Sequence, residues 1–246
     1  MMNRNAHEGT KGEQIVALEI KNNSKAARAI VQALTGEIPD GNLQAKAEIV
    51  GHLGGKTDVL IETSSGHKFK VSVKSYRGTG FNQVTRLSID AFAKQFSLPG
   101  RITTLLKELT LKKAGSPNRR HPWISKNHVS RIIAGFKPKA LAIIQFSLLG
   151  HDCPELLVLH NWNRREIRIY NMTEVLEQLK QLIDIKVTPQ GVLKLNEYFS
   201  IQKKGGNGKY IGYPKNDLRH GGNNIQVKMK TEKISALATS ISTLIY

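Results

Sequence analysis

The chain has 246 residues, enough for one sizeable hydrophobic core with a small subdomain but not for two large domains. Its 37 Lys and Arg residues outnumber 19 Asp and Glu residues, and the formal net charge of +18 predicts a polyanionic partner, first of all nucleic acid. A single cysteine excludes an internal disulfide and a multi-cysteine zinc site, and it suits a reducing cytosol.

The first part of the chain is expected to begin with helix and continue with strands. Apolar residues spaced by three or four occur over residues 12–34, with an interruption at residues 22–24, which predicts one broken helix or two short helices. Short apolar runs predict strands at residues 48–50, 57–62 and 69–74. A helical pattern follows and predicts a helix at residues 87–96.

The second part of the chain opens with a basic segment, residues 107–139, which holds nine Lys or Arg residues and one acidic residue. Such a charge excess is typical of a solvated, partly disordered loop. The longest apolar run, residues 140–149, is too short to span a bilayer, so we expect no membrane partner. We predict strands at residues 140–148, 155–159 and 166–170, then a helix over residues 173–182 with Thr173 as its cap.

The stretch "GKTDVLIETSSGHKFKVSVKSY", residues 55–76, is typical of a β-hairpin. If residues 65–67 form the loop, Asp58 lies opposite Lys74, and Leu60 lies opposite Ser72. The other face then carries only core side chains, because residues alternate between the two faces of a strand. A carboxylate, a hydroxyl and an ammonium group would therefore meet at the open end of the hairpin.

This arrangement has a chemical and a structural interpretation. Asp58 could hold a divalent cation as a hard oxygen ligand, while Lys74 positions the attacking water and offsets the charge that develops on a phosphate. The alternative is an ordinary surface ion pair between a turn Asp and a strand-end Lys. The hairpin pattern leaves both interpretations open.

Several motifs carry a resemblance to a known family. Thr57-Asp58 with Ser72-Val73-Lys74 resembles the PD-(D/E)XK nuclease core, and residues 9–13 resemble the start of the family's first helix. The sequences "VKSYRGTGFNQ" (73–83), "IQKKGGNGK" (201–209) and "NIQVKMK" (224–230) resemble small Type II restriction endonucleases of the HinP/MspI-like group, which cut four-base-pair palindromic sites.

The resemblance implies an α/β fold with a PD-(D/E)XK restriction-endonuclease-like core, in which helices flank a mixed central β-sheet. It implies a single endonuclease domain over residues 1–246, with the catalytic core in 1–100 and a basic DNA-binding part in 185–246. The implied activity is site-specific, Mg²⁺-dependent hydrolysis of double-stranded DNA by a cytoplasmic prokaryotic protein, a monomer or weak dimer.

By the same resemblance, Asp58 is the metal-binding acid, Lys74 is the catalytic lysine and the Val73 carbonyl is a metal ligand. Ser72 departs from the family, because the general pattern has an acid there and the HinP and MspI enzymes look like exceptions with an amide. A serine leaves the site one negative charge short. Glu13 is our first candidate for the compensating catalytic and metal-binding acid, with a solvent-facing helix-start Glu as its alternative. Glu48 is a weaker candidate.

The residues expected to contact DNA lie beyond the hairpin and near the C-terminus: Arg77, Asn82, Gln83, Lys203, Lys204, Asn207, Lys209, Gln226 and Lys228. The amides of Asn82 and Gln83 suit paired contacts on a base edge, and their alternative role is to cap a following helix. Two other functions stay open: a structure-selective nicking or repair nuclease on the same core, and a basic nucleic-acid-binding protein without catalysis. The serine at position 72 is the best argument for the last.

Overall fold

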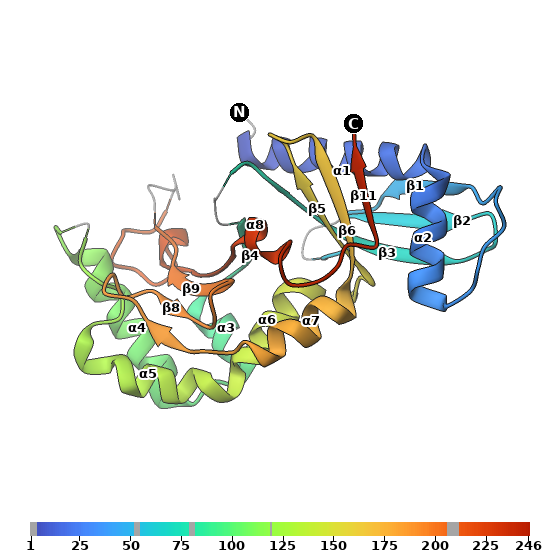
Figure 1. Ribbon diagram of the computed structural model, residues 1–246. Helices are drawn as coiled ribbons and strands as arrows, with labels where there is room; N and C mark the ends of the chain where they lie inside the picture. The colour runs from blue at the N-terminus through green and yellow to red at the C-terminus, as the bar shows by residue number, and fades with distance from the viewer. Residues whose placement is uncertain (1–3, 52–54, 79–81, 119, 206–211) are drawn as a thin grey trace. The chain divides into compact units, whose positions relative to one another are not determined.

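The computed structural model describes residues 4–51, 55–78, 82–118, 120–205 and 212–246, without the side chains of residues 4–7. The chain forms two compact units (Figure 1). Unit 1 comprises Met1–Asn82, Leu148–Gln181 and Thr231–Tyr246, and unit 2 comprises Gln83–Ser147 and Leu182–Lys230. Each unit has a sheet and helices of its own. The expectation of one endonuclease domain with catalytic and DNA-binding parts stays a prediction.

Unit 1 is built on a six-stranded sheet in the order β1 (Ala45–Ile49), β2 (Val59–Thr63), β3 (Lys68–Tyr76), β5 (Leu156–Asn161), β6 (Glu166–Asn171) and β11 (Ser242–Ile245). The pair β3–β5 is parallel and the other neighbouring pairs are antiparallel. Its helices are α1 (Arg4–Lys21), α2 (Ser24–Thr35), α7 (Met172–Gln181) and the short α8 (Thr231–Ile234). The predicted mixed α/β architecture, with helices flanking a mixed sheet, is therefore confirmed.

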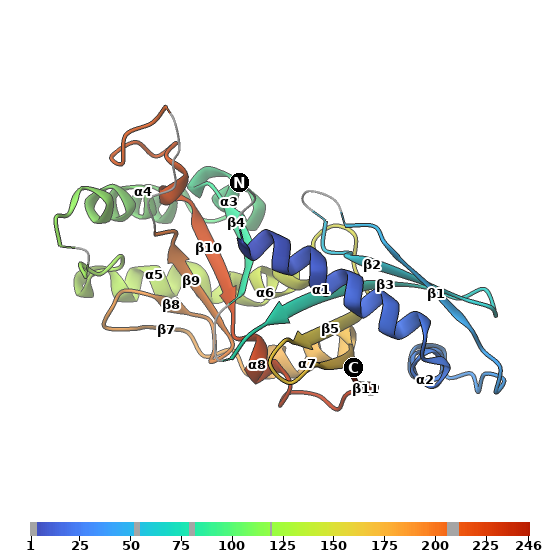
Figure 2. The same cartoon turned by 90° about the horizontal axis from the view of Figure 1, so that it is seen from above.

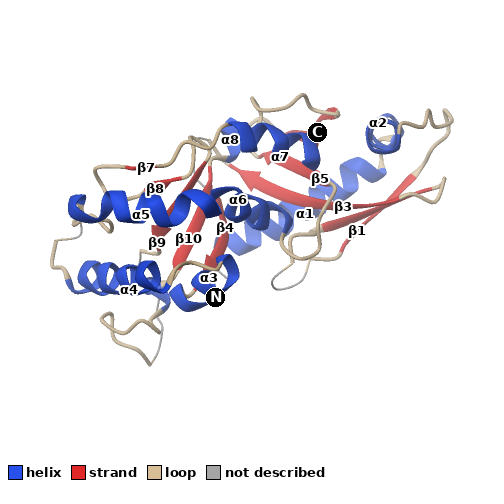
Figure 3. Ribbon diagram, turned by 90° about the horizontal axis from the view of Figure 1, so that it is seen from below, coloured by secondary structure: helices blue, strands red, loops and turns tan. Residues whose placement is uncertain are grey.

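The core of unit 1 lies between the sheet and the N-terminal helices. Val16 and Ile20 of α1 and Ile30 of α2 are fully buried against strand residues that include Val71 and Ile169. Helix α7 lies on the other side of the sheet from α1, as the views from above and from below both show (Figures 2 and 3). Strand β5 is buried along its whole length, which suits its continuous apolar run LLVL.

The predicted break in the first helical region is confirmed as two helices, α1 and α2. Asn23 caps α2, since its side chain accepts a hydrogen bond from the Ala26 N–H at 2.9 Å. The predicted helix near residue 87 is also present, as α3 (Ile89–Phe96). The predicted helix at residues 173–182 is α7, but its cap is Asn171, which accepts from the Thr173 N–H at 2.9 Å, rather than Thr173 itself.

The hairpin β2–β3 forms, with a register that differs from the predicted one. Val59 pairs with Val71 rather than Val73, so the loop is residues 64–66 instead of 65–67. The reason is Gly66, whose φ of 88° places it in the left-handed region. Three-residue hairpin loops favour such a residue at their last position. A shift of two residues preserves the faces, so the polar group of the hairpin stays on one side.

Unit 2 contains a five-stranded sheet in the order β4 (Asn82–Leu87), β10 (Ile225–Met229), β9 (Phe199–Lys203), β8 (Leu193–Lys194) and β7 (Lys186–Val187). Its main helices are α3, α4 (Gly100–Gly115), α5 (Val129–Phe136) and α6 (Ala140–Leu149), and α6 runs on to the first residues of unit 1. The short 3-10 helices are η1 (Lys126–His128), η2 (Lys137–Lys139) and η3 (Gly221–Asn223). Buried apolar side chains such as Leu106, Phe136 and Phe199 form its core.

Two predictions for the middle of the chain are wrong. The basic segment 107–139 is largely helical, because its charges flank apolar positions such as Leu109 and Ile132 that are buried. The apolar run after Ala140 is helix α6 rather than a strand, since a continuous apolar run does not distinguish the two and its Ala and Leu residues favour helix. Among the described residues one helical stretch, Lys126–Leu149, is long and apolar enough to cross a membrane by length and composition alone.

Candidate active site

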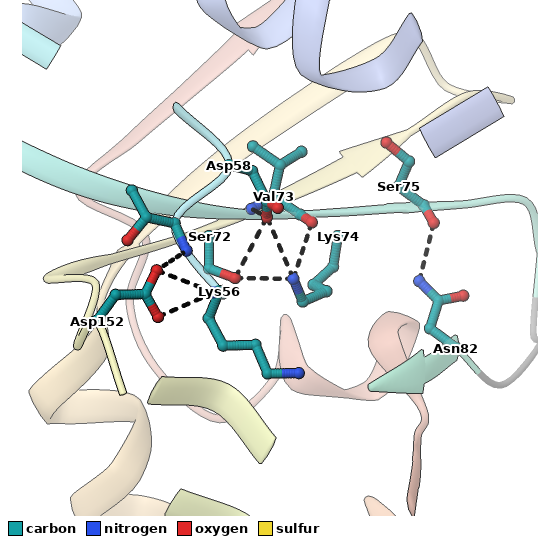
Figure 4. Close-up of polar contacts among 9 residues, drawn as sticks. Lys56, Asp58, Ser72, Val73, Lys74, Ser75, Asn82 and Asp152 are labelled. Atoms are coloured by element: carbon teal, nitrogen blue, oxygen red, sulfur yellow. Dashed lines mark hydrogen bonds and ion pairs between the residues drawn. The ribbon is translucent and has the colours of Figure 1, made fainter. Parts of the chain in front are cut away.

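The candidate site lies in unit 1. It is formed by the residue before β2 and by the part of β3 that follows the residues paired with β2. Asp58 directly precedes β2, and its backbone extends the sheet because its N–H donates to the Val71 carbonyl at 2.8 Å. Ser72, Val73 and Lys74 follow on β3. Residues two apart on a strand share a face, so Ser72 and Lys74 lie side by side next to Asp58 (Figure 4).

The Asp58 carboxylate is held by the neighbouring strand. Its Oδ2 accepts hydrogen bonds from the Val73 N–H at 2.7 Å and from the Ser72 hydroxyl at 3.5 Å. The Asp58 side chain is 19% exposed and the Lys74 side chain 14%, and the ion pair between them has an N–O distance of 3.3 Å. A pair this shielded is not the solvated surface pair of the alternative interpretation.

Lys74 is held from three sides. Its Nζ donates to the Ser72 Oγ at 2.7 Å, to the Val73 carbonyl at 3.1 Å and to Asp58 Oδ2 at 3.3 Å. These contacts match the three donors of an ammonium group. The Val73 carbonyl therefore faces the same small volume as the Asp58 carboxylate, as a metal ligand would.

Glu13 on α1 reaches this cluster. A Cβ placed on Gly51 would lie 3.8 Å from the Asp58 Cα and 3.9 Å from the Glu13 Oε2, so both residues border the same point. The pKa of Glu13 is raised above its usual range, first by burial and then by the negative charge of Asp58, while the charge of Lys74 opposes the shift. Glu13 is therefore not the solvent-facing helix-start residue of the alternative interpretation.

The other acids of the hairpin region are placed differently. Glu48 pairs with Leu60 across β1 and β2, on the face that also carries Asp58. Glu62 lies opposite Lys68 near the hairpin loop and forms an ion pair with it at 3.4 Å. Because Glu62 is four residues along the strand from Asp58, about 13 Å at roughly 3.3 Å per residue, it does not belong to the site.

The donor set fits a hard divalent cation. Two carboxylates, Asp58 and Glu13, repel each other across the site, and a cation between them would relieve the repulsion that raises the pKa of Glu13. The Val73 carbonyl adds a neutral oxygen. No group of three or more His, Cys, Asp and Glu side chains that could hold a metal ion occurs in the described part of the chain. Water would therefore have to complete a metal shell at this site.

Sequence reasoning missed two residues at the site, Lys56 and Asp152. The Asp152 carboxylate accepts from the Lys56 N–H at 2.9 Å and from the Thr57 N–H at 2.6 Å, which fixes the chain just before Asp58. Partial desolvation raises the pKa of Asp152, but the hydrogen bonds from Thr57 and Lys56 outweigh it and hold that pKa at about 2. The spacing of two between Lys56 and Asp58 was a usable signal for Lys56, whereas nothing local pointed to Asp152.

The reverse face of β3 is closed by a buried histidine. His160 of β5 is 0% exposed, its Nδ1 lies 3.1 Å from the Ser75 Oγ and its Nε2 lies 2.6 Å from the Tyr246 hydroxyl. Gly12 of α1 packs directly on this group, because a Cβ there would lie 2.0 Å from the Ser75 Oγ. The close approach of α1 to β3 at Gly12 brings its neighbour Glu13 to the site.

The residues predicted to contact DNA near the hairpin have defined partners. Arg77 lies 3.7 Å from Glu8 and stacks 5.2 Å from the centre of the Trp162 ring. The Asn82 side chain donates to the Ser75 carbonyl at 2.8 Å. Neither Asn82 nor Gln83 caps a helix, because both lie on β4 and the cap of α3 is Ser88.

Two of the predicted DNA-contacting amides meet in unit 2. The Gln226 side chain on β10 donates to the Gln83 Oε1 on β4, across a separation of 143 residues. Lys228 lies two residues beyond Gln226 on β10, opposite Ser200 of β9, and shares the face of Gln226. This face of the sheet is polar, although Gln226 itself is buried, and the alternate residues of β10, such as Val227, are apolar and buried.

The remaining predicted contacts lie around the end of β9. The Lys203 Nζ donates to the Gly222 carbonyl at 2.8 Å, and its pKa is lowered first by burial and then by the charge of Lys113. The Lys204 N–H donates to the Asn224 carbonyl at 2.7 Å. Asn207 and Lys209 lie outside the described residues. The Lys203 ammonium is thus engaged with the main chain of its own unit.

No family model matches the chain, and no curated protein matches it. Among solved structures, the chain is similar to the crystal structure of restriction endonuclease MspI in complex with its cognate DNA, with a TM-score of 0.47 and 12% sequence identity over 87% of this chain and 83% of that chain. A likeness at this level does not decide an activity, so the case for function rests on the geometry of the site.

Proposed function

We propose that this protein is a site-specific double-stranded DNA endonuclease, a Type II restriction enzyme of the HinP/MspI-like group with a PD-(D/E)XK core. The observation that carries the proposal is the shielded cluster of the Asp58 carboxylate, the Val73 carbonyl and the Lys74 ammonium, with the Glu13 carboxylate beside it. Carboxylate and carbonyl oxygens suit a hard divalent cation, and an ammonium group beside them suits the charge that develops on a phosphodiester during metal-assisted hydrolysis.

Asp58, Glu13 and the Val73 carbonyl would hold Mg²⁺. When bound, Mg²⁺ supplies Lewis acidity toward a phosphate oxygen and makes an attacking water more acidic. Lys74 then exchanges one of its internal acceptors for water or a phosphate oxygen, which orients the nucleophile and offsets charge in the transition state. Ser72 keeps the ammonium in place through the 2.7 Å hydrogen bond to its Oγ.

The charge of the chain supports DNA as the substrate. A net charge of +18 favours a polyanion, and phosphate contacts of this kind set affinity rather than sequence preference. The amides of Gln83 and Gln226 on the polar face of the unit 2 sheet supply donors and acceptors that suit a base edge. We infer that the protein works in the prokaryotic cytoplasm as a monomer or weak dimer.

One observation favours a second function, a basic nucleic-acid-binding protein without catalysis. Ser72 occupies the position where the general PD-(D/E)XK pattern has an acid, and its hydroxyl already accepts from Lys74. In this alternative the Asp58–Lys74 pair only holds the hairpin end together.

Incubation of plasmid DNA with the protein, in Mg²⁺ and in EDTA, separates these functions. Discrete bands in Mg²⁺ that vanish in EDTA support the restriction enzyme, and sequencing of the ends gives the cut site. An accumulating nicked circle indicates a nicking or repair nuclease. An unchanged plasmid together with a retained gel shift would contradict the proposal and support the binding protein.

A further inference from the structure

A second lysine extends into the candidate site. Lys56 precedes Asp58 by two residues, and its side chain runs along the same side of β3 as Lys74, beneath Ser72 (Figure 4). The charges of Asp58 and Lys74 both act on Lys56, which places its ammonium in their field. The site therefore has two lysine side chains on the same side of β3, of which Lys74 contacts the Asp58 carboxylate.

The position of Lys56 is built into the fold. Its backbone N–H donates to both oxygens of the Asp152 carboxylate, each at 2.9 Å, and the following N–H of Thr57 donates at 2.6 Å. Its aliphatic stem packs on Gly150, where a Cβ would lie 2.6 Å from the Lys56 Cγ. Gly150 has a φ of 60°, so the turn itself favours a residue without a side chain.

The charge of this arrangement suits a bound anion. The side chains of Lys56 and Lys74 extend on the same side of β3, so their positive charges repel each other. A negatively charged group bound between the two ammonium groups would relieve this repulsion. A phosphodiester offers two nonbridging oxygens that share one negative charge, enough for one contact to each lysine.

We propose that Lys56 is a second phosphate-contacting lysine of this site, which binds a nonbridging oxygen of the scissile phosphodiester opposite Lys74. The inference rests on the proposed nuclease function and deepens it, since it assigns two cations to one phosphate. Lys56 keeps its protons and no covalent bond to it forms or breaks. Asp152 is its positioning residue, because it touches the backbone of Lys56 rather than the substrate.

The first test is the salt dependence of DNA binding in metal-free buffer, which needs no catalysis. Lys56→Met keeps the aliphatic stem over Gly150 and removes the charge. The slope of log affinity against log salt is negative, and each phosphate contact that is lost makes it less steep by about 0.9. The matched control is Lys68→Met, which removes an equal charge from the same hairpin at an exposed residue that is paired with Glu62. Lys68 lies six residues from Lys74, about 20 Å at roughly 3.3 Å per residue.

We expect Lys56→Met to make this negative slope less steep by about one, and Lys68→Met to leave it unchanged. Equal slopes for the two variants would overturn the inference. If Lys56→Met does not fold, as judged by its melting curve, Lys56→Gln replaces it. This variant also removes the charge and keeps part of the aliphatic stem, so the same change of slope is expected, and an unchanged slope in a folded Lys56→Gln would overturn the inference.

The second test is single-turnover cleavage in Mg²⁺. Loss of one preorganised donor to the reacting phosphate lowers the rate by about 100-fold, so we expect this loss for Lys56→Met and near wild-type cutting for Lys68→Met. If the wild-type protein cuts DNA and Lys56→Met cuts it at the same rate, the inference is overturned and the proposed function stays intact. A wild-type protein that binds DNA but never cuts overturns the proposed function, while the salt slopes still decide whether Lys56 contacts phosphate.

Discussion

Acidification should destabilise this protein through His160, which the fold keeps neutral. The ring is 0% exposed, between the Ser75 hydroxyl and the Tyr246 hydroxyl. The pKa of His160 is lowered from 6.5 to about 4, first by burial and then by the positive charge of Arg77. Between these two values the unfolded chain binds a proton that the folded chain excludes, so the free energy of unfolding falls as the pH falls.

The magnitude follows from the shift. A change of 2.5 pKa units, the difference between 6.5 and about 4, corresponds to about 3.4 kcal/mol at roughly 1.36 kcal/mol per unit. The contribution is complete above pH 6.5 and is lost as the pH falls toward 4. Between pH 8 and pH 5 the expected loss is about 2 kcal/mol.

Urea unfolding followed by far-UV circular dichroism at pH 8 and pH 5 measures this loss. His160→Gln removes the titrating ring and is expected to be less stable than wild type at both pH values. The other seven of the eight histidines are common to both proteins, so their contributions cancel in the comparison. Wild type should lose about 2 kcal/mol more than the variant between pH 8 and pH 5. Equal losses in the two proteins would refute the assignment of a buried neutral histidine at position 160.

Asp58→Ala and Lys74→Ala should each abolish cleavage in Mg²⁺ while gel shifts in metal-free buffer persist, and wild-type-like cutting by either variant would refute the active-site assignment. Gln83→Ala and Gln226→Ala should each lower cognate cleavage by about 10- to 100-fold, less at a site altered at the contacted base pair. Because the two amides share a hydrogen bond, the double variant should cut little worse than either single one, and additive losses would show independent roles. Lys203→Ala should lower the free energy of unfolding by about 1 kcal/mol, since its ammonium donates to main-chain carbonyls. An unchanged urea midpoint, together with a less steep dependence of log DNA affinity on log salt, would instead indicate that Lys203 contacts phosphate.

Local sequence determined the chemistry of the hairpin and the faces of its strands. The alternation of side chains predicted that Asp58, Ser72 and Lys74 share one face. This prediction holds although the pairing of β2 with β3 differs from the predicted register, because the difference is two residues and side chains on a strand repeat every two residues. The interruption at residues 22–24 likewise predicted one broken helix or two short helices, and the structure has two, with Asn23 capping the second through a contact only three residues away.

Tertiary structure decided everything that depends on distant segments. Asp152 binds the backbone of Lys56 across 96 residues, and Gln226 meets Gln83 across 143, so no local pattern carries either contact. Glu13 reaches the site because Gly12 lets α1 approach β3 closely. The apolar run from Ala140 fits a buried helix as well as a buried strand by its pattern, and the surrounding core, together with the helix preference of its Ala and Leu residues, selects the helix.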